Sequence, residues 1–88
     1  DIYFSDTYNN RVRKISAATN LITTIAGDGV FGFGGDDGLA TNAQLAQPAG
    51  IVLAAGHLYI ADKFNQRVRG VDLSTNIIST YAGGGGLQ

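Results

Sequence analysis

The chain has 88 residues, six of them basic and seven acidic, and a formal net charge of −1. A charge this small provides no basic field that would hold a polyanion, which argues against nucleic acid as a partner. Thirteen glycines, one proline and a hydrophobic fraction of 44% indicate a turn-rich β protein instead of a disordered chain. No apolar run reaches the roughly 18 residues that a membrane span requires.

The first 27 residues predict three short strands joined by tight turns. Residues 2–5 are a short apolar run with aromatic and β-branched side chains, typical of a strand buried on both faces. Residues 6–10 are rich in turn formers and lead into an alternating polar and apolar strand over residues 11–15. A second turn follows, in which Asn20 is expected to adopt a left-handed conformation, and a third strand covers residues 21–26.

A segment rich in glycine and aspartate comes next, over residues 28–47. Within it, residues 41–46 favour a helical turn, because Ala, Gln and Leu are helix formers and Thr or Asn caps them. A further strand is predicted over residues 48–54, closed by the turn at residues 55 and 56.

The carboxylates of this segment raise the question of a calcium site. Asp28, Asp36 and Asp37 offer oxygen ligands on a flexible loop, as calcium prefers. Their spacing matches neither the EF-hand loop nor a glycine- and aspartate-rich nonapeptide repeat. Turn chemistry is therefore the better interpretation, and no cofactor is predicted.

Residues 57–83 then repeat residues 1–27, starting 56 positions later and without a gap. Twelve of the 27 aligned positions are identical, including both Arg-Val-Arg triplets at residues 11–13 and 67–69. Asn76 matches Asn20 and is expected to be left-handed as well. A fixed period of this kind identifies the building block of a repeat architecture.

The full period contains four strands and one long loop, which predicts an all-β fold. Four-stranded antiparallel units of this length are typical of propeller blades, so we expect a β-propeller segment of about two blades of a larger ring. A linear β-solenoid fits less well, because its coils are usually shorter and its strands parallel. Seven strands are predicted where two blades need eight, and methionine is absent even at position 1. We therefore expect the native polypeptide to continue at both ends with more blades.

Several spaced motifs resemble the NHL repeat of β-propellers. The matching residues are 48–51, 58–62 and 65–69, with 2–6 and 9–14 in the first copy, and the linker resembles the extended bacterial form of that repeat in residues 26–27, 35–36 and 40–45. The departures lie at Asp37 and Leu39, where such linkers usually carry Gly and Pro, and at Gly70, which replaces the basic residue that Lys14 supplies in the first copy.

The resemblance implies a division of the chain into blades. Residues 1–27 would be strands two to four of one blade, 28–48 an inter-blade linker, 49–83 a second blade, and 84–88 the start of another linker. It also implies a binding platform more often than an enzyme, and favours an extracellular or cell-surface location.

The polar residues that recur in both copies are interpreted as structural. A fold's requirements repeat, whereas active sites generally do not, so the aspartates are expected to accept backbone N–H bonds and the arginines to fix the strand edge. The set is Asp6, Asp62, Asn9, Asn65, Arg11 and Arg67. No catalytic residues are predicted, because His57 is the only histidine and no serine has a partnered base.

Contact residues are predicted among the loop aromatics and the strand arginines, since exposed aromatic and arginine side chains anchor interfaces. The set is Tyr8, Phe64, Arg13 and Arg69. Phe31 and Phe33 are further candidates, with the alternative that they pin the linker onto the blade.

The favoured function is a non-catalytic scaffold that binds a protein or glycan, with further NHL blades of the same or identical chains as partners. Two alternatives remain open. One is a propeller lyase of the peptidyl-hydroxyglycine amidating type, although the resemblance does not extend to its metal ligands. The other is an RNA-binding NHL propeller, suggested by the basic strip around Arg11 and Arg13 beside Tyr8, and opposed by the net charge.

Overall fold

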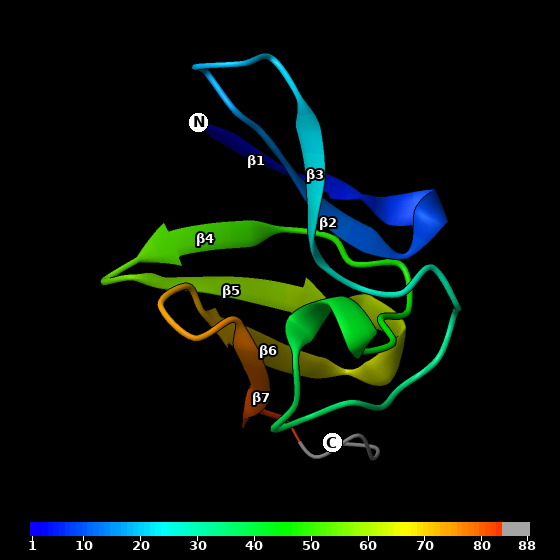
Figure 1. Ribbon diagram of the computed structural model, residues 1–88. Helices are drawn as coiled ribbons and strands as arrows, with labels where there is room; N and C mark the ends of the chain where they lie inside the picture. Colours follow the sequence, from blue (N-terminus) through cyan, green and yellow to red (C-terminus); the bar gives the residue numbers. More distant parts are fainter. Residues whose placement is uncertain (84–88) are drawn as a thin grey trace.

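The computed structural model describes residues 1–83, so the predicted linker start at residues 84–88 lies outside the described part (Figure 1). The chain is all-β and contains two antiparallel sheets, one of three and one of four strands, with neighbours in sequence order. The strands are β1 (Ile2–Asp6), β2 (Arg11–Ile15) and β3 (Ile22–Ala26), then β4 (Ile51–Ala54), β5 (His57–Asp62), β6 (Arg67–Asp72) and β7 (Ile77–Ala82). This is the architecture of a propeller segment of about two blades, as the repeat predicted.

The turns repeat with the strands. A 3-10 turn, Thr7–Asn9 or Lys63–Asn65, joins the first two strands of each repeat. Asn20 and Asn76 are left-handed, with φ of 60° and 63°, which confirms the expectation from sequence. The register also shifts at the same place in both copies, between Val12 and Arg13 and between Val68 and Arg69. A bulge of this kind bends the strand and redirects the side chains beside it.

Three expectations need correction. The strand predicted over residues 48–54 begins only at Ile51, although backbone bonds between Ala49, Gly50 and Ala61 extend the pairing backwards. The helical turn predicted over residues 41–46 is instead the 3-10 turn Ala40–Asn42, which ends because Ala43 is extended (φ −80°, ψ 161°).

The third correction concerns β1, which is not buried on both faces. Ile2 is 63% exposed, whereas the equivalent Leu58 in β5 is fully buried. Even β5 alternates between buried and half-buried residues. The copies differ because β5 lies between β4 and β6, with Leu58 in the buried cluster that includes linker residues, whereas β1 is the outer strand of its three-stranded sheet.

The linker lies between the two sheets and bonds to both. In Figure 1 it leaves β3, passes the turn between β5 and β6, and returns through the 3-10 turn to β4. Ala40 shows the arrangement most clearly: its carbonyl accepts from the N–H of Gly27 at 2.9 Å, and its N–H donates to Asn76 O at 2.8 Å. Ala40, Ala43 and Leu45 also share one buried cluster with residues of both copies. The linker therefore joins the blades by hydrogen bonds and by apolar packing.

The three 3-10 turns are the helical segments among residues 1–83, and none is long and apolar enough to cross a membrane.

Gly70 has a structural explanation. A Cβ built on Gly70 would lie 2.5 Å from Cε1 of Tyr81 and 3.2 Å from Cδ1 of Tyr59. The rings of Tyr59 and Tyr81 pack edge to face, with centroids 5.2 Å apart. In the first copy the residues equivalent to Gly70 and Tyr81 are Lys14 and Ile25. The glycine thus leaves room for a ring that the first copy does not have.

This arrangement predicts that Gly70→Ala destabilises the polypeptide that contains this chain by about 1–3 kcal/mol, the usual cost of overpacking. In a Tyr81→Ile background the same substitution should cost much less, because the ring that it strikes is gone. Urea unfolding of the four variants measures the coupling. Gly50→Ala is the matched control, since a Cβ there meets nothing within 4 Å. Equal costs with and without Tyr81 would contradict the explanation.

The exposed apolar residues predict that the isolated chain associates or folds poorly. Leu21 is 63% and Ile22 57% exposed, and leaving a few hundred Å² of such surface in water costs several kcal/mol at about 25 cal/mol per Å². Sedimentation at micromolar concentration should show oligomers or aggregates. The double variant Leu21→Ser/Ile22→Ser should associate less. A monomeric chain with a cooperative thermal transition would contradict this prediction.

Candidate functional site

The guanidinium of Arg69 occupies the centre of a buried polar cluster in the second copy. Its side chain is fully buried and forms an ion pair with Asp36 of the linker, Nη2 to Oδ1, at 2.9 Å. Nη1 donates to the carbonyl of Gln44 at 2.6 Å, and Nη2 donates to that of Gly34 at 2.7 Å. Arg69 therefore holds three separated points of the linker at once. The guanidinium therefore has no exposed surface among the described residues, and the contact role that the sequence suggested for Arg69 stays a prediction.

Asp62 and Asn65 complete the cluster. Asp62 is also fully buried; its carboxylate lies 3.3 Å from Nη1 of Arg69 and accepts the backbone N–H of Ala46 at 2.7 Å. Asn65 donates to Asp62 at 2.8 Å and to the carbonyl of Gly32 at 2.9 Å. The aspartate does accept a backbone N–H bond, as expected of a structural residue. That bond, however, comes from the linker and not from its own turn.

The equivalent residues of the first copy are more open. Arg13 and Asp6 form an ion pair at 3.0 Å, with side chains 25% and 27% exposed. Asn9 donates to both carboxylate oxygens of Asp6, at 3.0 and 3.1 Å. Nη1 of Arg13 lies 3.3 Å from Oγ1 of Thr24. The same residue types therefore form a half-exposed network in the first copy and a buried one in the second.

The two arginines that the sequence predicted as structural, Arg11 and Arg67, both face the linker. Arg11 donates to the carbonyl of Asp28 at 3.1 Å. The guanidinium carbon of Arg67 lies 4.2 Å from the ring centroid of Phe33. Their roles in the two copies are therefore not identical, although the residues are.

Aromatic side chains gather where the linker meets the 63–66 turn. The rings of Phe31 and Phe64 have centroids 5.9 Å apart, and Nζ of Lys63 lies 5.4 Å from the centroid of Phe64. Phe31, Phe33 and Phe64 are 56%, 43% and 53% exposed. We call Phe31 and Phe64 the aromatic patch, whereas Phe33 lies against Arg67. Phe31 and Phe33 contact the blade and are exposed at the same time, so both sequence interpretations describe part of their environment. Tyr8, the residue equivalent to Phe64, is exposed in the first copy.

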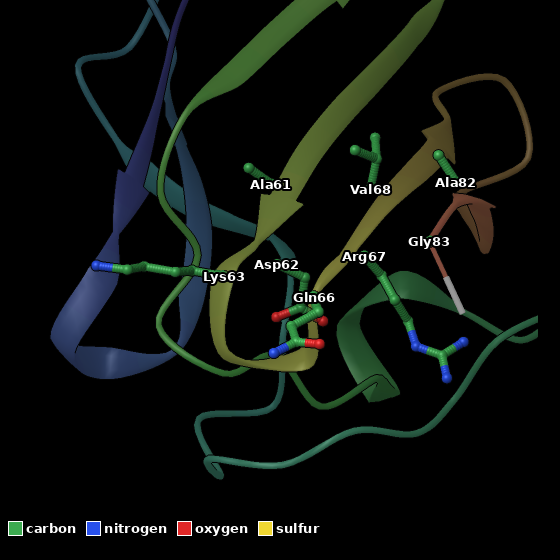
Figure 2. A pocket seen from close by; sticks show the side chains of 8 residues that line it. All are labelled: Ala61, Asp62, Lys63, Gln66, Arg67, Val68, Ala82 and Gly83. Carbon is green, nitrogen blue, oxygen red and sulfur yellow. The ribbon is translucent and has the colours of Figure 1, made fainter. Parts of the chain in front are cut away.

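A shallow pocket of about 270 Å³ opens on the second copy (Figure 2). Ala61, Val68 and Ala82 form its apolar wall, while Lys63 and Arg67 extend to opposite sides. In the first copy, Val12 and Ala26 occupy the positions of Val68 and Ala82, and both are fully buried in the cluster that contains Ala40 and Ala43. The pocket is therefore the place that the linker fills in the other copy.

The carboxylates considered for calcium are not brought together. Asp36 pairs with Arg69 and accepts a short hydrogen bond from Thr80, and Asp28 accepts the backbone N–H of Val30 at 2.9 Å. Residues 1–83 contain no group of three or more His, Cys, Asp or Glu side chains arranged to hold a metal ion.

Away from this region, the hydroxyl and backbone N–H of Ser74 hold the pKa of Asp72 below its ordinary value.

Two residues of the cluster were not predicted from the sequence. Asp36 appeared as a turn residue or calcium ligand, and Thr80 was not singled out. Thr80 and Thr24 are one of the identical pairs of the repeat, so the argument applied to the aspartates would have found them. Asp36 lies in the linker, which the sequence contains only once, so Asp36 has no counterpart in a second copy with which it could be compared.

Comparisons with known proteins support an NHL-type repeat. No family model matches the chain. It is 30% identical over 91 aligned residues to NHL repeat-containing protein 2 of Homo sapiens and of Bos taurus, which covers 96% of the chain and 12% of each of those proteins. It is 39% identical over 74 residues to the protein SUPPRESSOR OF QUENCHING 1, chloroplastic, of Arabidopsis thaliana, which covers 83% of the chain and 7% of that protein. The chain thus spans about a tenth of the length of these relatives.

The cluster predicts unequal effects for the two aspartates. Asp62→Ala removes the partner of a buried arginine and of two other donors, a loss of about 3–5 kcal/mol for a broken buried pair. Asp6→Ala removes a half-exposed ion pair, with an expected loss of about 1 kcal/mol or less. Urea unfolding of the two variants in parallel measures the difference, with Asp6→Ala as the matched control. Equal losses would show that burial by the linker does not determine the strength of the cluster.

Proposed function

We propose that this chain is part of an NHL-type β-propeller, with a linker of the extended bacterial type, that serves as a non-catalytic scaffold binding a protein or glycan. The similarity to NHL repeat-containing protein 2 supports the repeat type. The extracellular or cell-surface location suggested by the resemblance remains a prediction.

The observation that carries the proposal is the aromatic patch. Phe31 and Phe64, from two segments, remain about half exposed in contact with each other, with Lys63 beside the ring of Phe64. Rigid exposed aromatic rings provide contact area at little entropic cost, and flanking cations add orientation and electrostatic attraction. Tyr8 gives the first copy an aromatic side chain at the equivalent turn. Aromatic side chains at equivalent turns of successive repeats suit a partner that lies across several blades.

The use of the repeated polar residues also supports a scaffold. Asp62, Asn65 and Arg69 direct their polar atoms to the linker and to one another. A group engaged in this way serves the fold, whereas a catalytic acid or base needs a reacting partner within reach. The rigid blade then presents the loops, which are the usual place for binding residues.

The test compares two double variants of the polypeptide that contains this chain. Phe31→Ser/Phe64→Ser removes the aromatic patch, and Val52→Ser/Leu53→Ser removes an equally exposed apolar pair on β4. Binding is measured on a glycan array and by quantitative pull-down of protein partners. We expect the first variant to lose at least tenfold in affinity, the usual effect of an aromatic hot spot, with an unchanged melting temperature. The control variant should bind like the unaltered protein.

Equal effects of the two variants would exclude the aromatic patch as the contact surface.

The lyase alternative is tested separately, by metal analysis and an assay with a peptidyl-hydroxyglycine substrate. Stoichiometric metal together with turnover would overturn the scaffold in favour of the enzyme.

A further inference from the structure

Lys63 is a cation that the repeat does not require at its position. The equivalent residue of the first copy is Thr7, whose hydroxyl donates to the carbonyl of Pro48 at 2.8 Å and ties the turn to the chain that leads into β4. Lysine has no hydroxyl for such a bond, and Nζ of Lys63 lies 5.4 Å from the ring centroid of Phe64. Requirements of the fold recur in both copies, whereas this cation occurs in one, which indicates a role in binding.

The charge of Lys63 is not used within the part of the chain that the structure describes. Its ammonium forms no ion pair among residues 1–83, although carboxylates occur in the segments around it. Asp36 and Asp62 both contact the buried guanidinium of Arg69, at 2.9 and 3.3 Å. The carboxylate of Asp28 accepts a backbone N–H of the linker at 2.9 Å. The aromatic patch therefore has a cation at its edge that can pair with an anionic group of a partner.

Hydrogen bonds of the surrounding chain hold the two rings of the aromatic patch in place. Phe64 N donates to the carbonyl of Ala46 at 3.2 Å. The side chain of Asn65 donates to the carbonyl of Gly32 at 2.9 Å, and so connects the residue after Phe64 with the residue after Phe31. A surface that is fixed before binding loses little conformational entropy when a partner is bound. The patch is in this sense preorganised.

The geometry of the patch suits an apolar side chain better than a sugar. The planes of Phe31 and Phe64 are inclined by 44°, so the two rings do not form one flat platform. An aromatic or aliphatic side chain can pack against inclined rings in edge-to-face or offset contacts. A sugar also needs polar groups for its hydroxyls, and both amide hydrogens of Asn65 are already donated, to Gly32 and to Asp62.

We infer that the occupant of the aromatic patch is an acidic protein segment, in which an apolar or aromatic side chain stands beside at least one carboxylate. The apolar side chain contacts Phe31 and Phe64, and the carboxylate pairs with Nζ of Lys63. Such a charge pair at the edge of an apolar contact selects the partner and its orientation. The inference rests on the proposed scaffold function and names the class of its partner.

The experiment measures binding of the polypeptide that contains this chain to an immobilised library of short synthetic peptides. Each peptide has a central Phe or Leu, flanked by Asp and Glu, by Asn and Gln, or by Lys and Arg. Acidic flanks should raise the affinity about tenfold over amide flanks, the effect of one charge-assisted hydrogen bond. Added salt should reduce this difference, because it screens exposed charges.

Variants locate the preference at Lys63. Lys63→Gln should abolish the difference between acidic and amide flanks without weakening the amide peptides, and Lys63→Arg should retain it. Phe31→Ser/Phe64→Ser should weaken both kinds of peptide. Lys14→Gln is the matched control, because it removes the same charge from a lysine of the first copy that pairs with Asp1 at 3.9 Å. The melting temperature of each variant verifies folding.

Equal affinity for acidic and amide flanks, or a preference that survives Lys63→Gln, would overturn the inference. Glycan binding that depends on Phe31 and Phe64, without any peptide binding, would overturn it as well. In these cases the scaffold stands and only the class of partner is wrong. If no peptide, protein or glycan bound in a way that depends on the patch, the proposed function would fall together with the inference.

Discussion

The linker keeps one position against the second sheet because one buried guanidinium, that of Arg69, reaches linker positions that lie far apart along the chain. Its bonds to Gly34, Asp36 and Gln44 close a loop of the linker, and Asp62 supplies the second carboxylate that a buried cation needs. A buried ion pair adds little net stability relative to apolar packing, but losing one member is costly. Such a group specifies one arrangement of the linker over others.

Apolar packing supplies the stability that this polar cluster does not. Ala40 and Ala43 are small enough to fit between two sheets, and Leu45 fills the space beside them; all three are fully buried. The linker would otherwise be a long loop of glycine and aspartate, whose backbone groups water could satisfy equally well. Because its carbonyls and N–H groups bond to strands of both copies, burial leaves them paired. The blades are thus held together through an interposed segment.

Much of this fold could be predicted from the sequence, because the repeat marks the residues that every blade requires. The positions of the strands, the left-handed Asn20 and Asn76, and the structural interpretation of Asp62 all depended on that comparison. It is less informative where the copies differ. The exchange of Lys14 and Ile25 for Gly70 and Tyr81 involves positions that are neighbours in space but eleven residues apart in sequence.

Arg69 illustrates a different limit. Its alternating strand pattern indicated an exposed side chain, and the sequence contains no sign that a linker more than twenty residues upstream would cover it. Arg13, which follows the same Arg-Val pair in sequence, is in fact partly exposed. Burial at this position therefore depends on whether a linker is present, which is a tertiary property that strand periodicity cannot report.

The two copies are open on opposite faces, and this asymmetry explains the exposure pattern of the chain. The face of the first copy that carries Ile22 is open, while its other face, with Val12, is buried against the linker; in the second copy Ile78 is buried and Val68 is 37% exposed. The one linker covers one face of each copy, and the opposite face of each copy stays exposed among the described residues. The exposed apolar surface at these two faces therefore follows from the architecture of the repeat. The exposure of Phe31 and Phe64 has a different origin, because both rings stay exposed although the linker is in place. That distinction separates surface that the linker covers in one of the two copies from surface that stays exposed beside the linker.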